Sequence, residues 1–431
     1  MRLLPESTVV NLRAASTISQ KLAEGAHQAL ETQKGLFTLP DCAKGFESMF
    51  TKEDFNILLE HRQWDHTIKL VLGSEPKSSK VYLLSPVKQK ELDFFLEENL
   101  CTRQICLSKS PIAALVFFIK KKDGLLWLVQ DYRKLNSMTV KNRYPLPLIS
   151  ELVSQLCGAR YFTKLDVYWD FNNVCIKPGD EWKAAFRTNQ GMFKPLVMFF
   201  GMTNSLATFQ TMMNDIFHDL IAEGIMVVYL DDILIFTRTK KEHTKAIQQV
   251  LQVLQENKLF LCPEKYKFCK EQIKYLELVI SEEEVFMDPV KVARVREWPA
   301  PENKMDIQAF LGFVNFYRKF IQDFSAKAWF LFNLTCSEQV WMWSGKEQVV
   351  FEDLKTAVTT TLVLMSPQDL EPFRIEANSS DFVTEAVLSQ QSMTDGKWHP
   401  MAFYSKSLSP VEWNYEIHDK EMLAIIRMLE E

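Results

Sequence analysis

The stretch "MVVYLDDILIF", residues 226–236, places two adjacent aspartates, Asp231 and Asp232, inside an apolar run. The apolar flanks predict two short buried strands, with the acidic pair at or near the turn between them. One interpretation is an ordinary solvated turn, because aspartate is a common turn residue. The other is a carboxylate centre, which would need a further acidic group on a neighbouring strand.

The segment "FTKLDVYWDF", residues 162–171, supplies such a group, because Asp166 ends a predicted strand. If this strand lies beside the hairpin, three carboxylates converge and repel one another unless divalent cations neutralise them. Two hard cations held by carboxylates about 3.5–4 Å apart are the apparatus of phosphoryl or nucleotidyl transfer. If the strands are neighbours, Asp166, Asp231 and Asp232 form a metal site, and if they are not, the solvated turn remains the simpler interpretation.

Length and composition set the general class. The chain has 431 residues, of which 47% are hydrophobic, which is enough for two to four domains with their own cores. The net charge of −5 argues mildly against a nucleic-acid binder, although "FFIKKKDG" is a local basic patch. Eight scattered cysteines, no signal peptide and no apolar run of about 20 residues predict an intracellular protein with reduced thiols and no membrane span.

The pattern of apolar residues predicts strand pairs interleaved with helices, which favours α+β domains over a doubly wound parallel sheet. A hairpin is predicted over residues 114–132, where Asp123 and Gly124 would form the turn. Three strands are predicted beyond residue 370, over 372–380, 385–391 and 398–408. Helices are predicted over 85–100, 204–224 and 240–259, in the region 289–334, and over 418–431.

Many motifs along the chain follow the order known from one family. They include "SPIAALVFFIKKKDG", "QDYRKLNSMTVKNRYPLPLISEL", "YFTKLDV", "FFGMTNSLATFQTMMNDIF", "VVYLDDILIF", "FLGFVNFYRKFIQDFS" and "HPMAFYSKSLSP". "VVYLDDILIF" resembles the YxDD box of reverse transcriptases. The ordered set resembles the reverse transcriptase and RNase H region of the Pol polyprotein of gypsy-like LTR retrotransposons, over roughly residues 50–431.

The resemblance implies an α+β right-hand polymerase with fingers, palm and thumb, followed by a truncated RNase H-like α/β domain. It divides the chain into an N-terminal lead-in (1–49), fingers and palm (50–280), thumb and connection (281–365) and the RNase H-like part (366–431). The implied function is RNA-directed DNA polymerase, with an RNA or DNA template, a primer and deoxynucleoside triphosphates as partners. Template binding would rest mainly on phosphate contacts and would be sensitive to salt.

The resemblance also implies roles for single residues. Asp166, Asp231 and Asp232 would hold two Mg²⁺ ions, with Mn²⁺ as an alternative. Phe171 would lie under the sugar and exclude a 2′-hydroxyl, although ordinary core packing is its simpler interpretation. Lys121 would meet the triphosphate, although a solvated lysine run explains it equally well in isolation. The last two predicted nucleotide-site residues are Gln210 and Arg187.

Several positions depart from the family pattern. Trp127 replaces an arginine that contacts the triphosphate, and an indole cannot provide the bidentate fork of a guanidinium. Asp170 replaces a glycine or alanine and adds a carboxylate near the nucleotide. Cys175 replaces an arginine, Leu206 a proline, and Glu277 a glycine whose backbone position is expected to suit no side chain. These departures predict impaired polymerase activity, and the alternative is a catalytically dead retroelement relic that at most binds nucleic acid.

The RNase H-like part departs further. Asn378 stands where the family has its first metal-binding aspartate, and a neutral amide is a poorer Mg²⁺ ligand. Glu385 replaces a glycine in the next strand, and Glu421 matches the second carboxylate. The sequence ends at Glu431, before the other two acidic positions. We therefore predict no RNase H activity from this chain.

Overall fold

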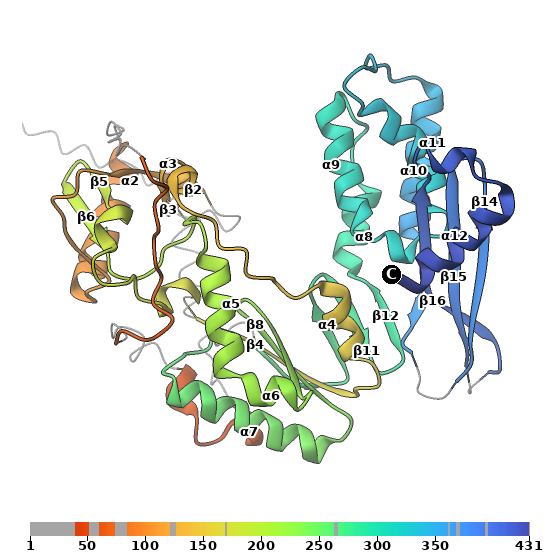
Figure 1. Ribbon diagram of the computed structural model, residues 1–431. Helices are drawn as coiled ribbons and strands as arrows, with labels where there is room; N and C mark the ends of the chain where they lie inside the picture. The colour runs from red at the N-terminus through yellow and green to blue at the C-terminus, as the bar shows by residue number, and fades with distance from the viewer. Residues whose placement is uncertain are drawn as a thin grey trace, which may run out of the picture. The chain divides into compact units, whose positions relative to one another are not determined.

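The computed structural model describes residues 39–50, 60–73, 84–120, 126–168, 170–262, 266–360, 363–367, 371–392 and 395–430 (Figure 1). The chain divides into two compact units, which are described separately below. The first comprises Met1–Tyr144 and Trp169–Met212, and the second comprises Pro145–Tyr168 and Met213–Glu431. The predicted lead-in up to residue 38 and the predicted turn at Asp123 and Gly124 lie outside the described residues.

The first unit is built on a five-stranded sheet of order β1-β6-β5-β2-β3. Its strands are β1 (Ile105–Leu107), β2 (Ala114–Lys120), β3 (Leu126–Asp131), β5 (Phe186–Thr188) and β6 (Gly191–Pro195). The predicted hairpin is confirmed, because β2 and β3 pair antiparallel. Its helices are α2 (Pro86–Cys101) and α3 (Arg133–Met138), with the 3₁₀ helices η1 (Asp41–Ala43), η2 (Glu47–Phe50), η4 (Asp170–Asn173) and η5 (Glu181–Ala184). Leu92 and Leu96 of α2 are buried in the same core cluster as Val116 and Leu128 of the sheet.

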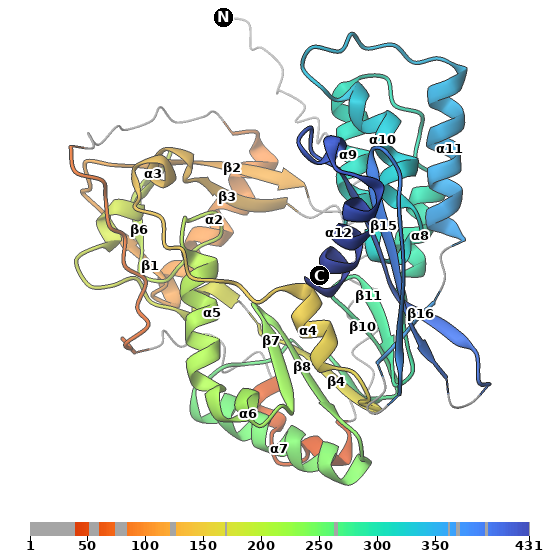
Figure 2. The same cartoon turned by 45° about the vertical axis from the view of Figure 1, so that its right-hand side comes forward.

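The second unit begins with a four-stranded sheet of order β7-β8-β4-β9 (Figure 2). Its strands are β4 (Tyr161–Asp166), β7 (Met226–Tyr229), β8 (Asp232–Thr237) and β9 (Lys267–Lys270). The helices of this part are α4 (Ile149–Gln155), α6 (His218–Ala222) and α7 (Lys240–Glu256), whereas α5 (Ser205–Ile216) lies mostly in the first unit. Helix α7 contacts β4 and β8, and the apolar face predicted for it, Ile247, Val250, Leu251 and Leu254, is fully buried.

A buried histidine fastens α7 to this sheet. His243 Nε2 lies 2.7 Å from Thr163 Oγ1 of β4, and its Nδ1 lies 3.1 Å from Thr237 Oγ1 of β8. Burial lowers the pKa of His243 to about 4. The imidazole is therefore neutral at physiological pH, when one ring nitrogen donates a hydrogen bond and the other accepts one.

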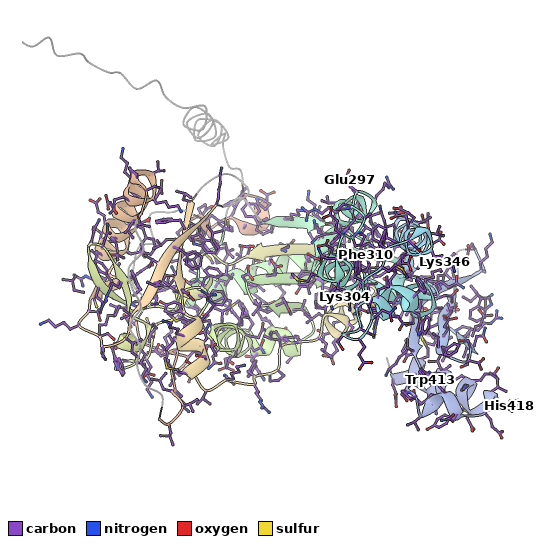
Figure 3. The ribbon with its side chains drawn as sticks, turned by 90° about the horizontal axis from the view of Figure 1, so that it is seen from above. Glu297, Lys304, Phe310, Lys346, Trp413 and His418 are labelled. Atoms are coloured by element: carbon purple, nitrogen blue, oxygen red, sulfur yellow. The ribbon has the colours of Figure 1, made fainter. Side chains whose placement is uncertain are left out.

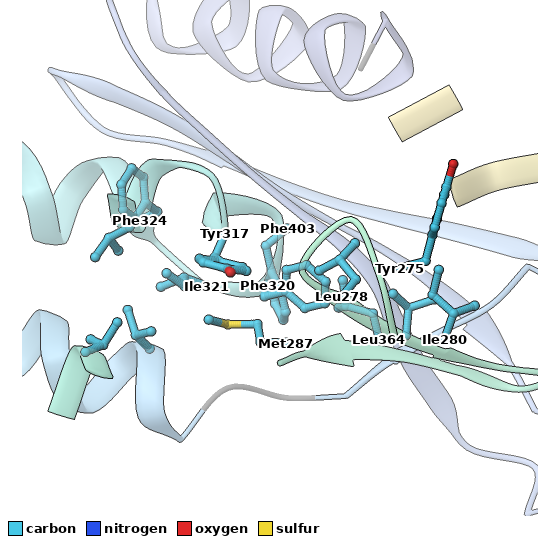
Figure 4. Packing of buried hydrophobic residues seen from close by; sticks show 14 of the residues in the cluster. Tyr275, Leu278, Ile280, Met287, Tyr317, Phe320, Ile321, Phe324, Leu364 and Phe403 are labelled. Carbon is cyan, nitrogen blue, oxygen red and sulfur yellow. The ribbon is translucent and has the colours of Figure 1, made fainter. Parts of the chain in front are cut away.

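A second sheet and a group of helices follow in the same unit. The sheet has the order β10-β11-β12-β13, with β10 (Gln272–Tyr275), β11 (Leu278–Ser281), β12 (Glu284–Met287) and β13 (Leu364–Met365). The helices are α8 (Pro289–Arg296), α9 (Lys304–Asn315), η6 (Arg318–Phe320), α10 (Phe324–Leu334) and α11 (Gly345–Thr359). Phe310, labelled in Figure 3, is fully buried. Figure 4 shows Met287 of the sheet beside Tyr317 and Phe320, and all three belong to one large apolar core.

The last sheet has the order β14-β15-β16. Its strands are β14 (Phe373–Ser379), β15 (Val383–Gln391) and β16 (Trp398–Ser407), and they are followed by η7 (Glu412–Asn414) and α12 (Ile417–Glu430). Helix α12 contacts β14 and β15, while β16 contacts α10. A small core of Ala386, Tyr404 and Met428 joins the helix to the sheet. The three strands and the final helix predicted beyond residue 370 are confirmed.

Some local predictions were wrong. The helix predicted over 204–224 is two helices, because the backbone leaves the helical region at Phe217 (φ −103°, ψ 15°). Ser85 precedes α2 as expected, but its side chain makes no capping hydrogen bond. Helix α11 and strands β10–β12 were not predicted. Among the described residues, no helix combines the length and the apolar character needed to cross a membrane.

Candidate active site

The run "MVVYLDDILIF" forms the hairpin of β7 and β8, with its acidic pair at the tip. Tyr229 pairs with Asp232, so that Leu230 and Asp231 are the two turn residues. Leu230 has a φ of 56°, in the left-handed region that costs a non-glycine residue about 1–2 kcal/mol. Both flanks are buried, namely Met226, Val227 and Val228 before the turn and Ile233, Leu234 and Ile235 after it. Burial of the two strands therefore holds the strained turn in place.

Strand β4 brings the third carboxylate to this tip. β4 pairs antiparallel with β8, and Asp166 stands directly opposite Asp232. The backbone N–H of Val167 donates to the carbonyl oxygen of Asp231 at 3.1 Å, which ties the end of β4 to the turn. Asp166 is buried, and a carboxylate oxygen from each of the three aspartates lies within 4.8 Å of the others. The structure thus brings together the three carboxylates that the sequence analysis singled out.

Lys164 is a charged member of this cluster that the sequence analysis missed. Its Nζ lies 2.7 Å from Asp232 Oδ1, and the two side chains are only 19% and 21% exposed. Lys164 and Asp166 are two residues apart on one strand, so their side chains emerge on the same face. That period-two spacing was the signal in the sequence. The ammonium group offsets part of the negative charge of the three aspartates.

Tyr275 of β10 adds a buried hydroxyl beside the cluster. Its ring centre lies 5.9 Å from Lys164 Nζ. Burial raises the pKa of Tyr275, and the negative charge of Asp232 raises it further, so the phenol stays protonated. Its Oη is buried and has no hydrogen-bond partner among the described residues. The phenol is therefore a buried hydrogen-bond donor on a ring that contacts Lys164.

The donor set of the three aspartates suits a hard divalent cation. Mg²⁺ prefers oxygen ligands and usually binds to one or two protein carboxylates together with substrate phosphates and water. Asp166, Asp231 and Asp232 supply oxygen donors only, at one end of a rigid sheet. The residues present therefore fit Mg²⁺ or Mn²⁺, and they would not favour a metal that prefers sulfur or nitrogen.

Phe171 belongs to a row of aromatic rings in the first unit. Its ring meets Phe200 edge-on at 4.8 Å and Phe209 at 5.8 Å between centroids. Trp127 meets the other end of this row, 5.0 Å from Phe200 and nearly perpendicular to it. Phe171 is 7% exposed and Trp127 38% exposed. We call Trp127, Phe200, Phe171 and Phe209 the aromatic row.

The other predicted nucleotide-site residues are less informative. Gln210 is fully buried in α5. Arg187 is half-buried in β5, where it stands opposite Leu115 and Met192. Lys121 lies outside the described residues. None of these three therefore gains or loses support as a nucleotide ligand from its placement.

The turn between β10 and β11 bears out the expectation for Glu277. Tyr275 pairs with Leu278, which leaves Leu276 and Glu277 as a two-residue turn. Both turn residues have positive φ, 46° and 67°, as in a type I′ turn, where glycine or asparagine is preferred. The Glu277 carboxylate forms an ion pair with Lys291 and accepts a hydrogen bond from Tyr317 Oη at 3.4 Å. These contacts offset part of the strain.

The acidic residues expected in the RNase H-like part do not gather. Asn378 of β14 stands opposite Glu385 of β15, and Asn378 is exposed. Glu421 is exposed on α12. Burial, followed by the negative charge of Asp323, raises the pKa of Glu385 to about 7. Among the described residues, neither group of potential metal ligands includes Glu385 or Glu421.

Two segments of the chain match models of known protein families. Residues 119–280 match the model of the reverse transcriptase (RNA-dependent DNA polymerase), and residues 343–431 match that of the RNase H-like domain found in reverse transcriptase. The chain therefore contains a reverse transcriptase domain followed by an RNase H-like domain. All three clustered aspartates lie inside the first match.

Curated relatives point to retrotransposons. The Tf2-3 and Tf2-7 transposon polyproteins of Schizosaccharomyces pombe are each 35% identical to the chain over 392 residues, which are 91% of this chain and 29% of theirs. The chain thus spans less than a third of the length of these relatives. It corresponds to the reverse transcriptase region of such polyproteins.

Solved structures confirm the predicted fold class. The foamy viral protease–reverse transcriptase dRH in complex with double-stranded DNA has a TM-score of 0.79 at 17% identity, covering 100% of this chain and 74% of that one. The same enzyme with an RNA/DNA hybrid has a TM-score of 0.74 at 18% identity, covering 96% and 54%. At this low identity the likeness establishes the reverse transcriptase fold alone.

Proposed function

We propose that the chain is an RNA-directed DNA polymerase whose catalytic and metal-binding residues are Asp166, Asp231 and Asp232. The observation that carries this proposal is the convergence of the three carboxylates at the tip of β7 and β8, inside the segment that matches the reverse transcriptase model. Two divalent ions, Mg²⁺ or alternatively Mn²⁺, would be held there. When bound, they would activate the primer 3′-hydroxyl and stabilise the charge on the transferred phosphates.

The residues around the aspartates would position them. Pairing of β4 with β8 keeps Asp166 opposite Asp232, and Lys164 orients the Asp232 carboxylate. Because the flanking strands are buried, their side chains have little freedom to reorganise when substrate binds. The protein's contribution would be three fixed carboxylates that hold the two cations in the positions that in-line nucleotidyl transfer requires.

The substrates follow from the same assignment. We propose an RNA or DNA template with a primer, bound mainly through its phosphates, and deoxynucleoside triphosphates as the second substrate. The solved structures described above contain an RNA/DNA hybrid or double-stranded DNA, which supports this class of ligand. Lys121, Phe171, Arg187 and Gln210 are the proposed nucleotide-binding residues. The Phe171 ring would exclude a ribose 2′-hydroxyl.

A specific contact favours a second candidate function. Trp127 occupies the position of the family's triphosphate-binding arginine and packs on Phe200 of the aromatic row. A ring held in this way offers no charge to a triphosphate. The alternative is therefore a retroelement relic that binds nucleic acid without turnover. We also propose that the RNase H-like part is inactive, because Asn378 is a poor Mg²⁺ ligand and Glu421 belongs to no group of three potential metal ligands among the described residues.

Primer extension on an RNA template distinguishes the two functions. The wild-type chain should extend the primer in Mg²⁺, while Asp231→Asn should lower the rate at least about 100-fold. Asp219→Asn, which changes an exposed aspartate, is the matched control. Equal background signal from wild type and Asp231→Asn would contradict the polymerase. In that case Trp127→Arg with Asp170→Gly should restore extension if these departures cause the loss.

A further inference from the structure

A second group of potential metal ligands lies in the first unit. His61 Nδ1 is 2.5 Å from Asp65 Oδ2. One ring nitrogen of His61, one carboxylate oxygen of Asp65 and the Sγ of Cys175 all lie within 4.8 Å of one another. Cys175 and Asp65 are largely shielded from solvent, while the His61 side chain is 57% exposed. One nitrogen, one oxygen and one sulfur donor therefore converge from two segments that are more than 100 residues apart in the sequence.

Backbone hydrogen bonds hold the two segments together. The N–H of His66 donates to the carbonyl oxygen of Cys175 at 2.8 Å, and the N–H of Lys177 donates to that of His66 at 2.9 Å. Asp65 is oriented separately, because its Oδ1 accepts from the N–H of Arg62 at 3.0 Å. Asp65 and Cys175 are thus held in place by the backbone before any ion binds.

A small cavity adjoins Asp65 and Cys175. Its volume is about 10 Å³, close to the minimum that holds one water molecule or a single ion. Asp65 and Cys175 both line it, together with Glu60 and Asn173. Arg62 also lines the cavity.

We propose that His61, Asp65 and Cys175 bind one transition-metal ion of the Zn²⁺ class. Zinc takes histidine nitrogen, carboxylate oxygen and cysteine sulfur at about 2.0–2.3 Å, whereas Mg²⁺ disfavours sulfur and nitrogen. One carboxylate and one thiolate carry two negative charges, which balance a divalent ion. Glu60 or water completes a tetrahedral site. The ion fastens residues 60–66 to residues 174–177.

Binding requires two local changes. The hydrogen bond between His61 and Asp65 must open, because ligand atoms around a tetrahedral zinc ion stand roughly 3–4 Å apart. The exposed His61 side chain has room to turn. Burial raises the pKa of the Cys175 thiol to about 11, so binding must also displace its proton. Metal ions displace thiol protons in structural sites because the metal–thiolate bond more than offsets this cost.

The simpler explanation is a surface ion pair between His61 and Asp65, with Cys175 as an ordinary core residue. Titration of the full chain with Co²⁺ under reducing conditions separates the two explanations. Co²⁺ bound to a thiolate gives a charge-transfer absorption band that oxygen ligands do not produce. We expect one equivalent of Co²⁺ to produce the band, and Zn²⁺ to remove it by displacement.

Variants assign the band to this site. Cys175→Ser should abolish it, and His61→Gln should weaken Co²⁺ binding at least tenfold, whereas the controls Cys336→Ser and His218→Gln should leave it unchanged. His61→Gln changes an exposed side chain, so it keeps the test valid even if Cys175→Ser does not fold. The band should persist in the Asp166→Asn/Asp231→Asn variant, which separates this site from the polymerase centre. Absence of the band in the wild type, or its persistence with full affinity in His61→Gln, would overturn the proposal.

Discussion

Asp166 and Asp232 stand opposite each other on the paired strands β4 and β8, and Asn378 and Glu385 stand opposite each other on β14 and β15. The first pair is joined by a third carboxylate from the adjoining turn and by the ammonium of Lys164. In the second pair, one member is a neutral, exposed amide and the other is a carboxyl group affected by Asp323. Strand register alone places two side chains opposite each other in both sheets. The β4–β8 pair differs because Asp231 and Lys164 add a further carboxylate and a cation beside it.

The two sheets also differ in backbone strain. The β7–β8 turn holds Leu230 at a positive φ, whereas Gly396 is the single residue with positive φ between the start of β14 and the end of β16 among the described residues. Strained backbone persists where the surrounding structure enforces it, and it is concentrated at functional sites. The strained turn at Leu230 therefore agrees with the proposed site at the β7–β8 tip, and the β14–β16 sheet offers no such feature among the described residues.

Loss of the lysine should have the largest effect on stability. Lys164→Met removes the cation beside Asp232 and should lower the free energy of unfolding by about 2 kcal/mol in EDTA, since one partner of a largely buried pair is left behind. Saturating Mg²⁺ should recover part of this loss, because bound ions neutralise the same carboxylates. Denaturant unfolding with and without Mg²⁺ measures both effects, with exposed Lys270→Met as control. If Lys164→Met loses the same free energy of unfolding with and without Mg²⁺, Lys164 has no part in ion binding.

The carboxyl group of Glu385 should make stability depend on pH. Its pKa in the folded chain, about 7, exceeds the ordinary value of 4.5. The folded state therefore holds the proton more tightly, and stability falls as pH rises from about 4.5 to 7. Glu385→Gln should remove this fall and gain on the order of 1–2 kcal/mol above pH 7, after allowance for solvent screening.

Thermal unfolding between pH 5 and 8 checks the prediction for Glu385. The matched control is Glu376→Gln on the neighbouring strand, which should keep the slope of the wild-type chain. A slope that Glu385→Gln leaves intact would show that another group titrates in this range.

Strain at Leu230 should give a smaller effect. Leu230→Gly should be about 1 kcal/mol more stable than Leu230→Ala, because only alanine retains the left-handed penalty. At exposed Arg374 in β14 the order should reverse, because the free energy of unfolding of Arg374→Gly should be about 0.5–1 kcal/mol lower than that of Arg374→Ala. Urea denaturation of the four variants provides the comparison. If the glycine variant is less stable than the alanine variant at both positions, Leu230 is not strained at the β7–β8 tip.

Sequence patterns predicted the parts of the fold in which one physical signal dominates. The apolar spacing in residues 240–259 predicted the buried face of α7, and the apolar flanks of Asp231 and Asp232 predicted the β7–β8 hairpin. Short strands such as β10–β12 escaped prediction, because four residues carry too little periodicity. The break at Phe217 also has no glycine or proline to indicate it.

The candidate site was predictable to a similar extent. Three acidic residues on predicted strands indicated the carboxylate cluster, but the register that places Asp166 opposite Asp232 depends on tertiary pairing. Lys164 was visible two residues before Asp166, yet its partner depends on the same register. The approach of Cys175 to His61 and Asp65 could not be read from spacing, because more than 100 residues separate them.

Binding of Mn²⁺, followed by electron paramagnetic resonance, tests the contrast between the two sheets most directly. The titration uses Cys175→Ser as the parent chain, so that the proposed zinc-class site cannot contribute. We predict that Asp166→Asn with Asp231→Asn abolishes specific Mn²⁺ binding, and that Asn378→Asp and Glu421→Gln leave the number of bound ions and their affinity unchanged. Undiminished binding after loss of Asp166 and Asp231 would contradict the assignment of the ion site to the β7–β8 tip.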